Sequence, residues 1–377
     1  EVQKGEFIML TTWKHLASSK KKFILLFSLA ILVLYSFVTY FSASTLYQNM
    51  MQAEANHAAR MNQTAAEPGK TPPDPLPPVG AYTTVKVGTY LDDIDNFSIR
   101  DSYWTANLYV WFSWQGDRTL DPGGKFVLVD GVINKKELLE EYHDGNGVNY
   151  QRYKVTAKLI KFFDTTRVPI ENHMLNIYIE DGARDGSKVR YEADAASNIS
   201  SRTAIPGYKI LGGQNVVKTH TYKSSYGDPR VTGNTSKIFS QYIYGVNIKR
   251  VDYGVYIKIF LSLFAALALT LSSFFIKPSD IGPRFSLPTA AYFGAVANSY
   301  VANSILPPSG SFGLVDHIAG IGLFTIFMSI ALSLFSHYLF VRKDEKELSA
   351  VFDRAMFAAV GIGCLAANII VPLCARL

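Results

Sequence analysis

Five apolar stretches, each long enough to cross a membrane as a helix, constrain this chain more than any other feature. They cover residues 23–46, 256–276, 285–306, 314–340 and 355–373. An α-helix needs about 20 residues to cross the roughly 30 Å hydrocarbon core of a bilayer. We therefore expect an integral membrane protein, with one N-terminal transmembrane helix at 23–46 and a four-helix transmembrane bundle within 251–377.

Basic residues beside the apolar stretches predict the orientation of the chain. Residues 20–22 are all lysine and directly precede the first stretch, so the positive-inside rule keeps the tail 1–22 in the cytoplasm. The same orientation puts the later basic residues on the cytoplasmic side: Lys277, Arg284, Arg342, Lys343 and Lys346. The polar residues 47–250 are then outside. A cleaved signal peptide is the alternative for 23–46, but this apolar run is too long for one.

The segment 47–80 is predicted to link the first helix to a folded domain. Residues 47–63 are rich in the helix formers Ala, Met, Gln and Glu, so the helix is expected to continue beyond the membrane. The Pro-rich run 71–78 then stops any helix, because proline lacks a backbone donor and clashes with the preceding turn. Such a run favours an extended linker.

Residues 81–250 are predicted to form an outer β-sandwich domain. Every second residue of 104–114 is apolar, which places these side chains on one face of a strand. The same alternation recurs at 155–159 and 175–179. Residues 135–142 are an exception, because their Lys, Glu and Leu content predicts a short helix. The expected fold class is therefore α+β.

Composition argues against several other classes of function. The formal net charge of +6 is spread along the chain or lies beside apolar runs, so no nucleic-acid partner is expected. The two cysteines, Cys364 and Cys374, lie in or beside the last apolar stretch. His143, His173 and His220 are too far apart for metal-ligand spacing. No nucleophile, base and orienting group occur together, so we expect no enzyme activity, metal or cofactor.

Several motifs occur in an order that resembles a known family. Trp114 and Asp117 look like a tryptophan and an aspartate that close an early strand, although their spacing is one residue wider. Residues 163–175 look like a signature loop whose proline is Pro169. Arg250 lies just before the second apolar stretch, where the family places an arginine that meets this loop.

The strongest match is the sequence Gly-Pro-Arg-Phe-Ser-Leu-Pro-Thr at 282–289, which opens the third apolar stretch and is followed by Pro307 past its outer end. On these motifs, residues 82–377 resemble the pentameric ligand-gated ion channels, in particular the prokaryotic members that lack the disulfide of the signature loop. Two features depart from the family pattern. Glu171 stands where an aspartate is usual, and no proline interrupts 256–276.

The resemblance implies an assembly, a location and a coupling loop. Four identical subunits would join each chain in the lipid bilayer, inorganic ions would pass between them, and an unknown small molecule or proton would be the stimulus. The expected location is a bacterial inner membrane, with the N-terminus cytoplasmic and the β domain periplasmic or extracellular. Five residues are expected to couple the β domain to the pore: Asp164, Pro169, Glu171, Arg250 and Asp316.

The third apolar stretch, 285–306, is expected to line the pore. It is rich in Ser, Thr, Asn, Gly and Ala, and so is less apolar than a lipid-facing helix needs to be. The family register aligns one stripe along this helix: Ser286, Ala290, Phe293, Ala297 and Tyr300. A ring of Phe293 side chains is expected to close the pore by expelling water.

Two alternatives to this register stay open at the level of sequence. In the first, Phe293 and Tyr300 pack between neighbouring helices. In the second, the pore faces a competing stripe: Leu287, Ala291, Gly294, Asn298 and Val301. At the inner mouth, Gly-Pro-Arg with Arg284 resembles the entrance of anion-selective members, whereas the nearby Asp280 opposes the arginine. The sequence thus favours anions only weakly.

The resemblance places a ligand in an aromatic box between neighbouring outer domains, where ring faces hold cationic or amphipathic ligands. The candidates are Tyr222, Tyr226, Tyr242 and Tyr244, with 222–236 as a capping loop. Aromatic residues are also common in the core of a β-sandwich. Two other functions fit the pattern: a non-conducting sensor or scaffold with the channel fold, and an anchored periplasmic binding protein. The polar character of 285–306 favours a pore.

Overall fold

The computed structural model of the chain describes residues 13, 16–66, 74–76, 81–224, 226–227, 236–251, 254–307 and 311–376. The chain divides into two compact units. The helical unit comprises Glu1–Met50, Thr165–Glu171 and Asp252–Leu377, and the β unit comprises Met51–Asp164 and Asn172–Val251. The fold is mixed α+β, and the order of its parts along the chain is compatible with the predicted order.

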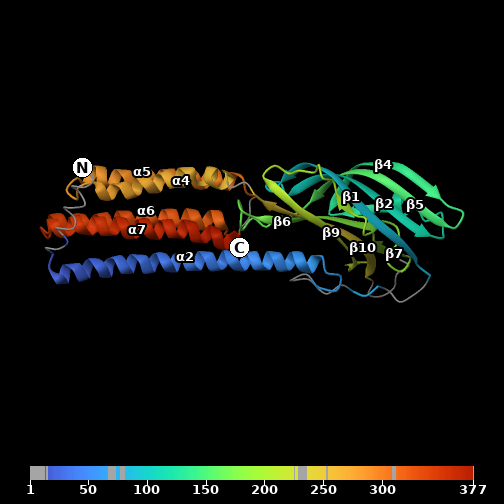
Figure 1. Cartoon of the computed structure of the whole chain (residues 1–377), viewed down its shortest axis with the longest axis horizontal. Helices are drawn as coiled ribbons and strands as arrows, with labels where there is room; N and C mark the ends of the chain where they lie inside the picture. Colours follow the sequence, from blue (N-terminus) through green and yellow to red (C-terminus); the bar gives the residue numbers. More distant parts are fainter. Residues whose placement is uncertain are drawn as a thin grey trace. The chain divides into compact units, whose positions relative to one another are not determined.

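The described part of the β unit contains ten strands in two sheets (Figure 1). The first sheet has the order β4-β5-β2-β1-β7, with β8 paired to β1. Its strands are β1 (Thr83–Ser98), β2 (Tyr103–Gln115), β4 (Gly131–His143), β5 (Val148–Ile160), β7 (Val189–Ala193) and β8 (Asn198–Ile199). The second sheet has the order β3-β6-β10-β9. Its strands are β3 (Phe126–Val129), β6 (Asn172–Asp181), β9 (Tyr208–Tyr222) and β10 (Lys237–Arg250), and a short helix α3 (Pro122–Lys125) precedes β3.

The predicted alternation places the core of the β unit correctly. The apolar side chains at alternate positions from Trp104 to Trp114 of β2 are all buried. Leu175, Ile177 and Ile179 of β6 are fully buried and belong to the same core cluster. Complete burial of a side chain of this size stabilises a fold by roughly 2 kcal/mol, so the two inner faces are the main source of stability in this unit.

Residues 135–142, expected to form a short helix, lie within strand β4, so that prediction was wrong. This stretch pairs with β5, and Glu140 forms an ion pair with Arg152 of that strand at 3.0 Å. The Nζ atom of Lys136 lies 4.0 Å from the ring centre of Phe126. Helix propensities differ by less than about 1 kcal/mol per residue for such side chains, and pairing with a neighbouring strand outweighs them.

The helical unit is built from long helices. These are α2 (Ser18–Arg60, which continues into the β unit), α4 (Gly254–Ser272, followed by a 3-10 turn at Ser273–Phe275), α5 (Ile281–Ser304), α6 (Leu314–Val341) and α7 (Lys346–Arg376). Within the described ranges, four helices are long and apolar enough to cross a membrane: α2, α4 with its 3-10 turn, α6 and α7. The chain thus has the helices of a membrane protein. Helix α5 forms where a helix was predicted, but it is not one of these four.

Helix α2 packs with one face on α6 and α7 (Figure 1). The Tyr35 hydroxyl donates to Thr325 Oγ1 at 2.8 Å, and the Phe27 ring stacks on Phe335 with centroids 5.3 Å apart. Large apolar side chains are exposed elsewhere on α2: Leu25, Leu26, Leu29, Val33 and Phe37. Its continuation to Arg60 agrees with the helix expected for 47–63. Most of the Pro-rich run 71–78 lies outside the described residues.

Gly363 of α7 provides a test of this packing. A Cβ atom added there would lie 2.5 Å from Cγ of Tyr35. We expect Gly363→Ala to push α2 away and to lower the free energy of unfolding by about 1–3 kcal/mol, measured as a lower midpoint of thermal unfolding in detergent. Gly361→Ala on the same helix is the control, because its Cβ would meet nothing within 4 Å. Equal midpoints for the two variants would contradict the packing.

Candidate pore helix, coupling loop and ligand site

Helix α5 packs against the rest of the helical unit through one of its own faces. Its buried residues recur every three or four positions: Arg284, Pro288, Ala291, Ala295, Asn298 and Ala302. The carboxamide oxygen of Asn298 accepts hydrogen bonds from Ser262 Oγ at 2.6 Å and from the backbone NH of Leu263 at 3.3 Å, both on α4. The alanines on this face let neighbouring helices approach closely. These contacts determine which residues of α5 are left exposed.

The predicted pore stripe lies outside this buried face. All five of its residues are exposed in the chain: Ser286, Ala290, Phe293, Ala297 and Tyr300. Phe293 is 67% exposed and Tyr300 is 82% exposed, so neither packs between helices of its own chain. In the competing stripe, Ala291 and Asn298 are buried against the bundle. The structure therefore leaves the predicted stripe available and uses much of the competing stripe for packing.

Arg284, expected at the inner mouth of the pore, does not lie on the exposed stripe. Its side chain is fully buried and forms a bidentate ion pair with Asp353 of α7. Nη1 of the guanidinium donates to Oδ2 of the carboxylate at 2.9 Å, and Nη2 donates to Oδ1. Asp280, the other residue expected there, is exposed at the N-cap position of α5. The arginine on which the preference for anions depended is thus neutralised inside the bundle.

The predicted signature loop contributes Thr165–Glu171 to the helical unit, where it meets the start of α6. The backbone NH of Leu314 donates to the carbonyl oxygen of Thr166 at 2.7 Å. The carboxylate of Asp316 accepts a hydrogen bond from the NH of Gly313 at 2.9 Å and completes the cap of this helix. The loop therefore satisfies one of the backbone donors that a helix start leaves without an internal partner.

The five predicted coupling residues are divided between the two units. Pro169, which follows a cis peptide bond, and the fully buried Glu171 belong to the helical unit, as Asp316 does. Asp164 and Arg250 belong to the β unit. Arg250 Nη2 donates to the Tyr208 hydroxyl at 2.6 Å, and its guanidinium lies 4.3 Å from the centre of that ring. The pairing of Arg250 with Glu171 or Asp164 stays a prediction.

Gly313 tests the contact between the loop and α6. A Cβ atom added there would lie 2.9 Å from the carbonyl oxygen of Thr166 and 3.0 Å from its Cα, and neither backbone atom can rotate away. We expect Gly313→Ala to displace the loop and remove a hydrogen bond, at a cost of about 1 kcal/mol. Amide hydrogen exchange across Thr165–Glu171 should become faster. Gly320→Ala in α6, which meets nothing within 4 Å, should leave it unchanged. Unaltered exchange in the Gly313 variant would refute the contact.

The four candidate ligand residues fall into two separate pairs. The rings of Tyr222 and Tyr226 lie 5.9 Å apart, and Phe239 meets Tyr222 edge-on at 5.4 Å. Tyr242 and Tyr244 are buried in the core between the sheets, so the structure does not bring them together with the first pair. Alternate residues of a strand face opposite ways, so the even-numbered tyrosines of β10 share the core face. Most of the capping loop 222–236 lies outside the described residues.

A buried carboxylate beside Tyr222 was not among the predicted site residues. Glu180 of β6 is 2% exposed and accepts three hydrogen bonds. The donors are His220 Nδ1 at 2.5 Å, Gln241 Nε2 at 2.7 Å and the Tyr222 hydroxyl at 3.0 Å. Burial raises the pKa of Tyr222 well above its usual value, and the charge of Glu180 raises it further. We refer to Glu180, His220, Tyr222, Tyr226, Phe239 and Gln241 as the Glu180 cluster.

The sequence contains only part of the signal for this cluster. The alternation of β6, with Ile177 and Ile179 in the core, indicates that Glu180 faces away from the core. The partners of Glu180 follow 40 and 61 residues later, on two other strands. Sheet order, which local patterns do not determine, brings them together.

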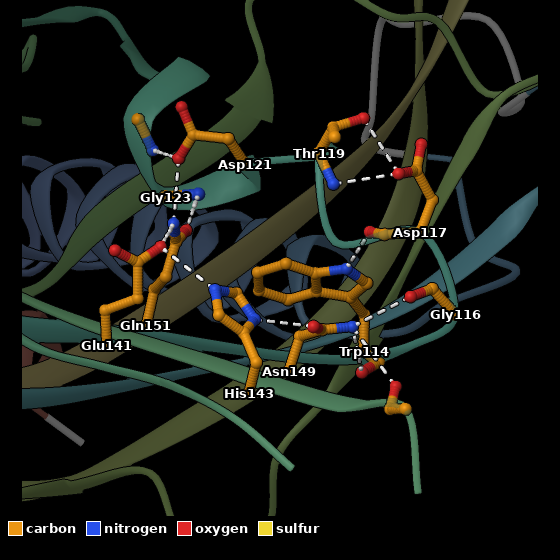
Figure 2. Close-up of polar contacts among 12 residues, drawn as sticks. Trp114, Gly116, Asp117, Thr119, Asp121, Gly123, Glu141, His143, Asn149 and Gln151 are labelled. Carbon is orange, nitrogen blue, oxygen red and sulfur yellow. Dashed lines mark hydrogen bonds and ion pairs between the residues drawn. The ribbon is translucent and has the colours of Figure 1, made fainter. Parts of the chain in front are cut away.

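The Trp114 and Asp117 motif has a structural role in the turn after β2 (Figure 2). The indole Nε1 of Trp114 donates to the backbone oxygen of Asp117 at 2.7 Å. The Asp117 carboxylate accepts hydrogen bonds from the hydroxyl and the backbone NH of Thr119, and these bonds lower its pKa. The motif therefore closes the turn through bonds made within three residues of itself.

A second set of bonds in Figure 2 joins this turn to β4 and β5. The amide nitrogen of Asn149 donates to the carbonyls of Gly116 and Gly147, each at 3.2 Å. Its oxygen therefore faces His143 Nδ1, at 2.6 Å, and that nitrogen must carry a proton. The other ring nitrogen, Nε2, lies 3.7 Å from a carboxylate oxygen of Glu141. The network links the ends of three strands.

No protein-family model matches the sequence, and the comparison with curated proteins finds no match. The likeness to pentameric channels therefore rests on the motifs named above.

The hydrogen bonds to Glu180 can be tested without a ligand, through their contribution to local stability. Glu180→Gln would turn an amide NH₂ toward groups that themselves donate, leaving a buried donor without an acceptor. We expect a loss of about 1–3 kcal/mol of local stability, measured as faster hydrogen exchange in β9 and β10. Glu192→Gln on β7 is the control, because this carboxylate is exposed. Equal exchange in the two variants would show that the buried hydrogen bonds contribute little.

Proposed function

We propose that the chain is one subunit of a homopentameric ion channel whose pore is lined by α5 and whose β unit receives the stimulus. The observation that carries the proposal is the exposed face of α5. Exposed positions on the other helices include large apolar residues suited to lipid: Leu25 and Phe37 on α2, Leu261 on α4, Phe327 on α6 and Leu365 on α7. The exposed face of α5 also carries large apolar residues, among them Tyr292, Val296 and Val301. What sets it apart is the set of small and polar residues between them: Ser286, Thr289, Ala290, Ala297 and Asn303.

This face of α5 is poorly suited to hydrocarbon. Hydroxyl and amide groups in a membrane helix favour the interior of a bundle or a water-filled cavity. The described part of the chain offers α5 no protein cover on that side, so further copies of the chain are the simplest source of it. Copies joined head to tail form a closed ring when the rotations between neighbours add up to a full turn. A ring of α5 helices around an axis would place the stripe against water, and the resemblance supplies the number five.

Phe293 is the best candidate for the gate in such a ring. It is flanked on the stripe by Ala290 and Ala297, whose small side chains leave more space one turn to either side. Five aromatic rings at one level would form an apolar constriction, which expels water before the pore is sterically blocked. Tyr300, also on the stripe, carries a hydroxyl group that can keep water in contact.

The Glu180 cluster is the best candidate for reception of the stimulus. A buried carboxylate lies beneath partly exposed aromatic rings, and both features attract a cation. A small organic cation fits this chemistry. The contact between Thr166 and the start of α6 supports a route by which the signature loop acts on the helices.

Replacement of the gate residue tests this function directly. We expect Phe293→Ser to raise the resting conductance of bilayers containing the full-length chain by about tenfold or more, because a hydroxyl ring keeps the pore wet. Leu287→Ser on the competing stripe is the matched control and should have a smaller effect. A silent Phe293 variant beside a leaky Leu287 variant would reverse the register.

Particles without five-fold symmetry would contradict the assembly. A five-fold particle that never conducts, even as the Phe293 variant, would favour the non-conducting sensor.

A further inference from the structure

The ion pair between Arg284 and Asp353 lies at the end of α5 where ions would enter or leave. Arg284 is 0% exposed and Asp353 is 3% exposed, so both charges are out of contact with solvent. Arg284 Nη1 also donates to the carbonyl oxygen of Ile276 at 2.8 Å, which holds the guanidinium against the end of the preceding helix. The pair joins α5 to α7 across the bundle.

The position of Asp353 is itself held by α6. One turn earlier on α7, Ser349 Oγ donates to the carbonyl oxygen of Ser336 at 2.9 Å and lies 2.8 Å from its hydroxyl oxygen. Bidentate pairs between a guanidinium and a carboxylate are strong and geometrically specific. Because a buried charge left alone is costly, each member depends on the other. The carboxylate therefore cancels the arginine charge and also fixes where the guanidinium lies.

Because Asp353 cancels the charge of Arg284, the net charge at this end of α5 depends on the other residues there. Gly282 and Pro283 carry no charge, and Ser286 is the first residue of the exposed stripe. The exposed ionisable groups of the turn before the helix are Lys277 and Asp280. Of these, Asp280 is the N-cap residue and is closer in sequence to the stripe. With the five arginines cancelled, the ring of five Asp280 side chains is the charge nearest in sequence to the stripe, and the five Lys277 side chains lie three residues earlier.

We propose that Asp353 is a specificity-determining residue of the channel, which acts by cancelling Arg284 so that the inner end of the pore does not select anions. The inference rests on the proposed channel function. Asp353 would act at a distance, because it positions and neutralises the arginine without lying on the stripe. Removal of the carboxylate charge would add one net positive charge per subunit at this end, whether or not the guanidinium moves.

Reversal potentials under a KCl gradient test the proposal, measured on the full-length chain carrying Phe293→Ser so that no agonist is needed. We expect the parent channel to pass K⁺ at least as well as Cl⁻. Asp353→Asn should lower the ratio of K⁺ to Cl⁻ permeability by about tenfold, since five uncompensated charges act together at close range. Arg284→Gln should raise the ratio. Glu347→Gln, an equal charge change at an exposed position of α7, should leave it unchanged.

Further variants keep the test decisive if Asp353→Asn does not assemble. Asp353→Glu should retain the parent permeability ratio. Asp280→Asn, at an exposed position, should shift the ratio toward Cl⁻. A parent channel that selects Cl⁻, or conducting Asp353 and Asp280 variants with the parent ratio, would overturn the proposal while leaving the channel function intact. Absence of current from every variant, the Phe293→Ser parent included, would overturn the channel function and this inference with it.

Discussion

Two buried polar contacts determine the rotation of helix α5 about its axis. This rotation decides which residues of the helix are buried and which are exposed. Arg284 pairs with Asp353, and Asn298 accepts a hydrogen bond from Ser262. Asn298 follows Arg284 by 14 residues (298 − 284), close to four turns, so both anchors lie on one face. Rotation of α5 by one position, about 100°, would leave a buried charge and a buried amide without partners, at a cost of several kcal/mol. The exposed stripe is the complement of these anchors.

The Glu180 cluster follows the same rule that buried polar groups need partners. Three donors converge on the Glu180 carboxylate, so its oxygens are occupied by the sheet itself. A cation above Tyr222 would therefore experience the negative field of the carboxylate more than a hydrogen bond from it. Such a field is stronger in a partly buried site than in water, and the aromatic faces add to it. This chemistry favours a weakly hydrated cation over an anion or a neutral ligand.

The sequence predicted those features that repeat with a local period. Alternation located β2 and β6, and apolar runs located the long helices. Prediction failed where the deciding partner is distant: Asp353 lies 69 residues after Arg284, and no local pattern joins them. Residues 135–142 were misassigned because helix propensity takes no account of β5, the neighbouring strand. For Tyr242 and Tyr244, a period of two separates the faces of a strand but does not say which face meets the core.

The start of α6 indicates how the loop can act on a helix at small energetic cost. Thr166 accepts a hydrogen bond from the NH of Leu314, one of the donors that a helix start leaves without an internal partner. Withdrawal of the loop would expose that donor, at a cost of about 1 kcal/mol per subunit. In the proposed ring of five subunits the costs would sum to about 5 kcal/mol, close to the differential affinity that moves a two-state equilibrium from one extreme to the other. In the proposed channel, a backbone hydrogen bond, which no side-chain motif encodes, would then be strong enough to couple stimulus and gate, and weak enough to be broken by binding.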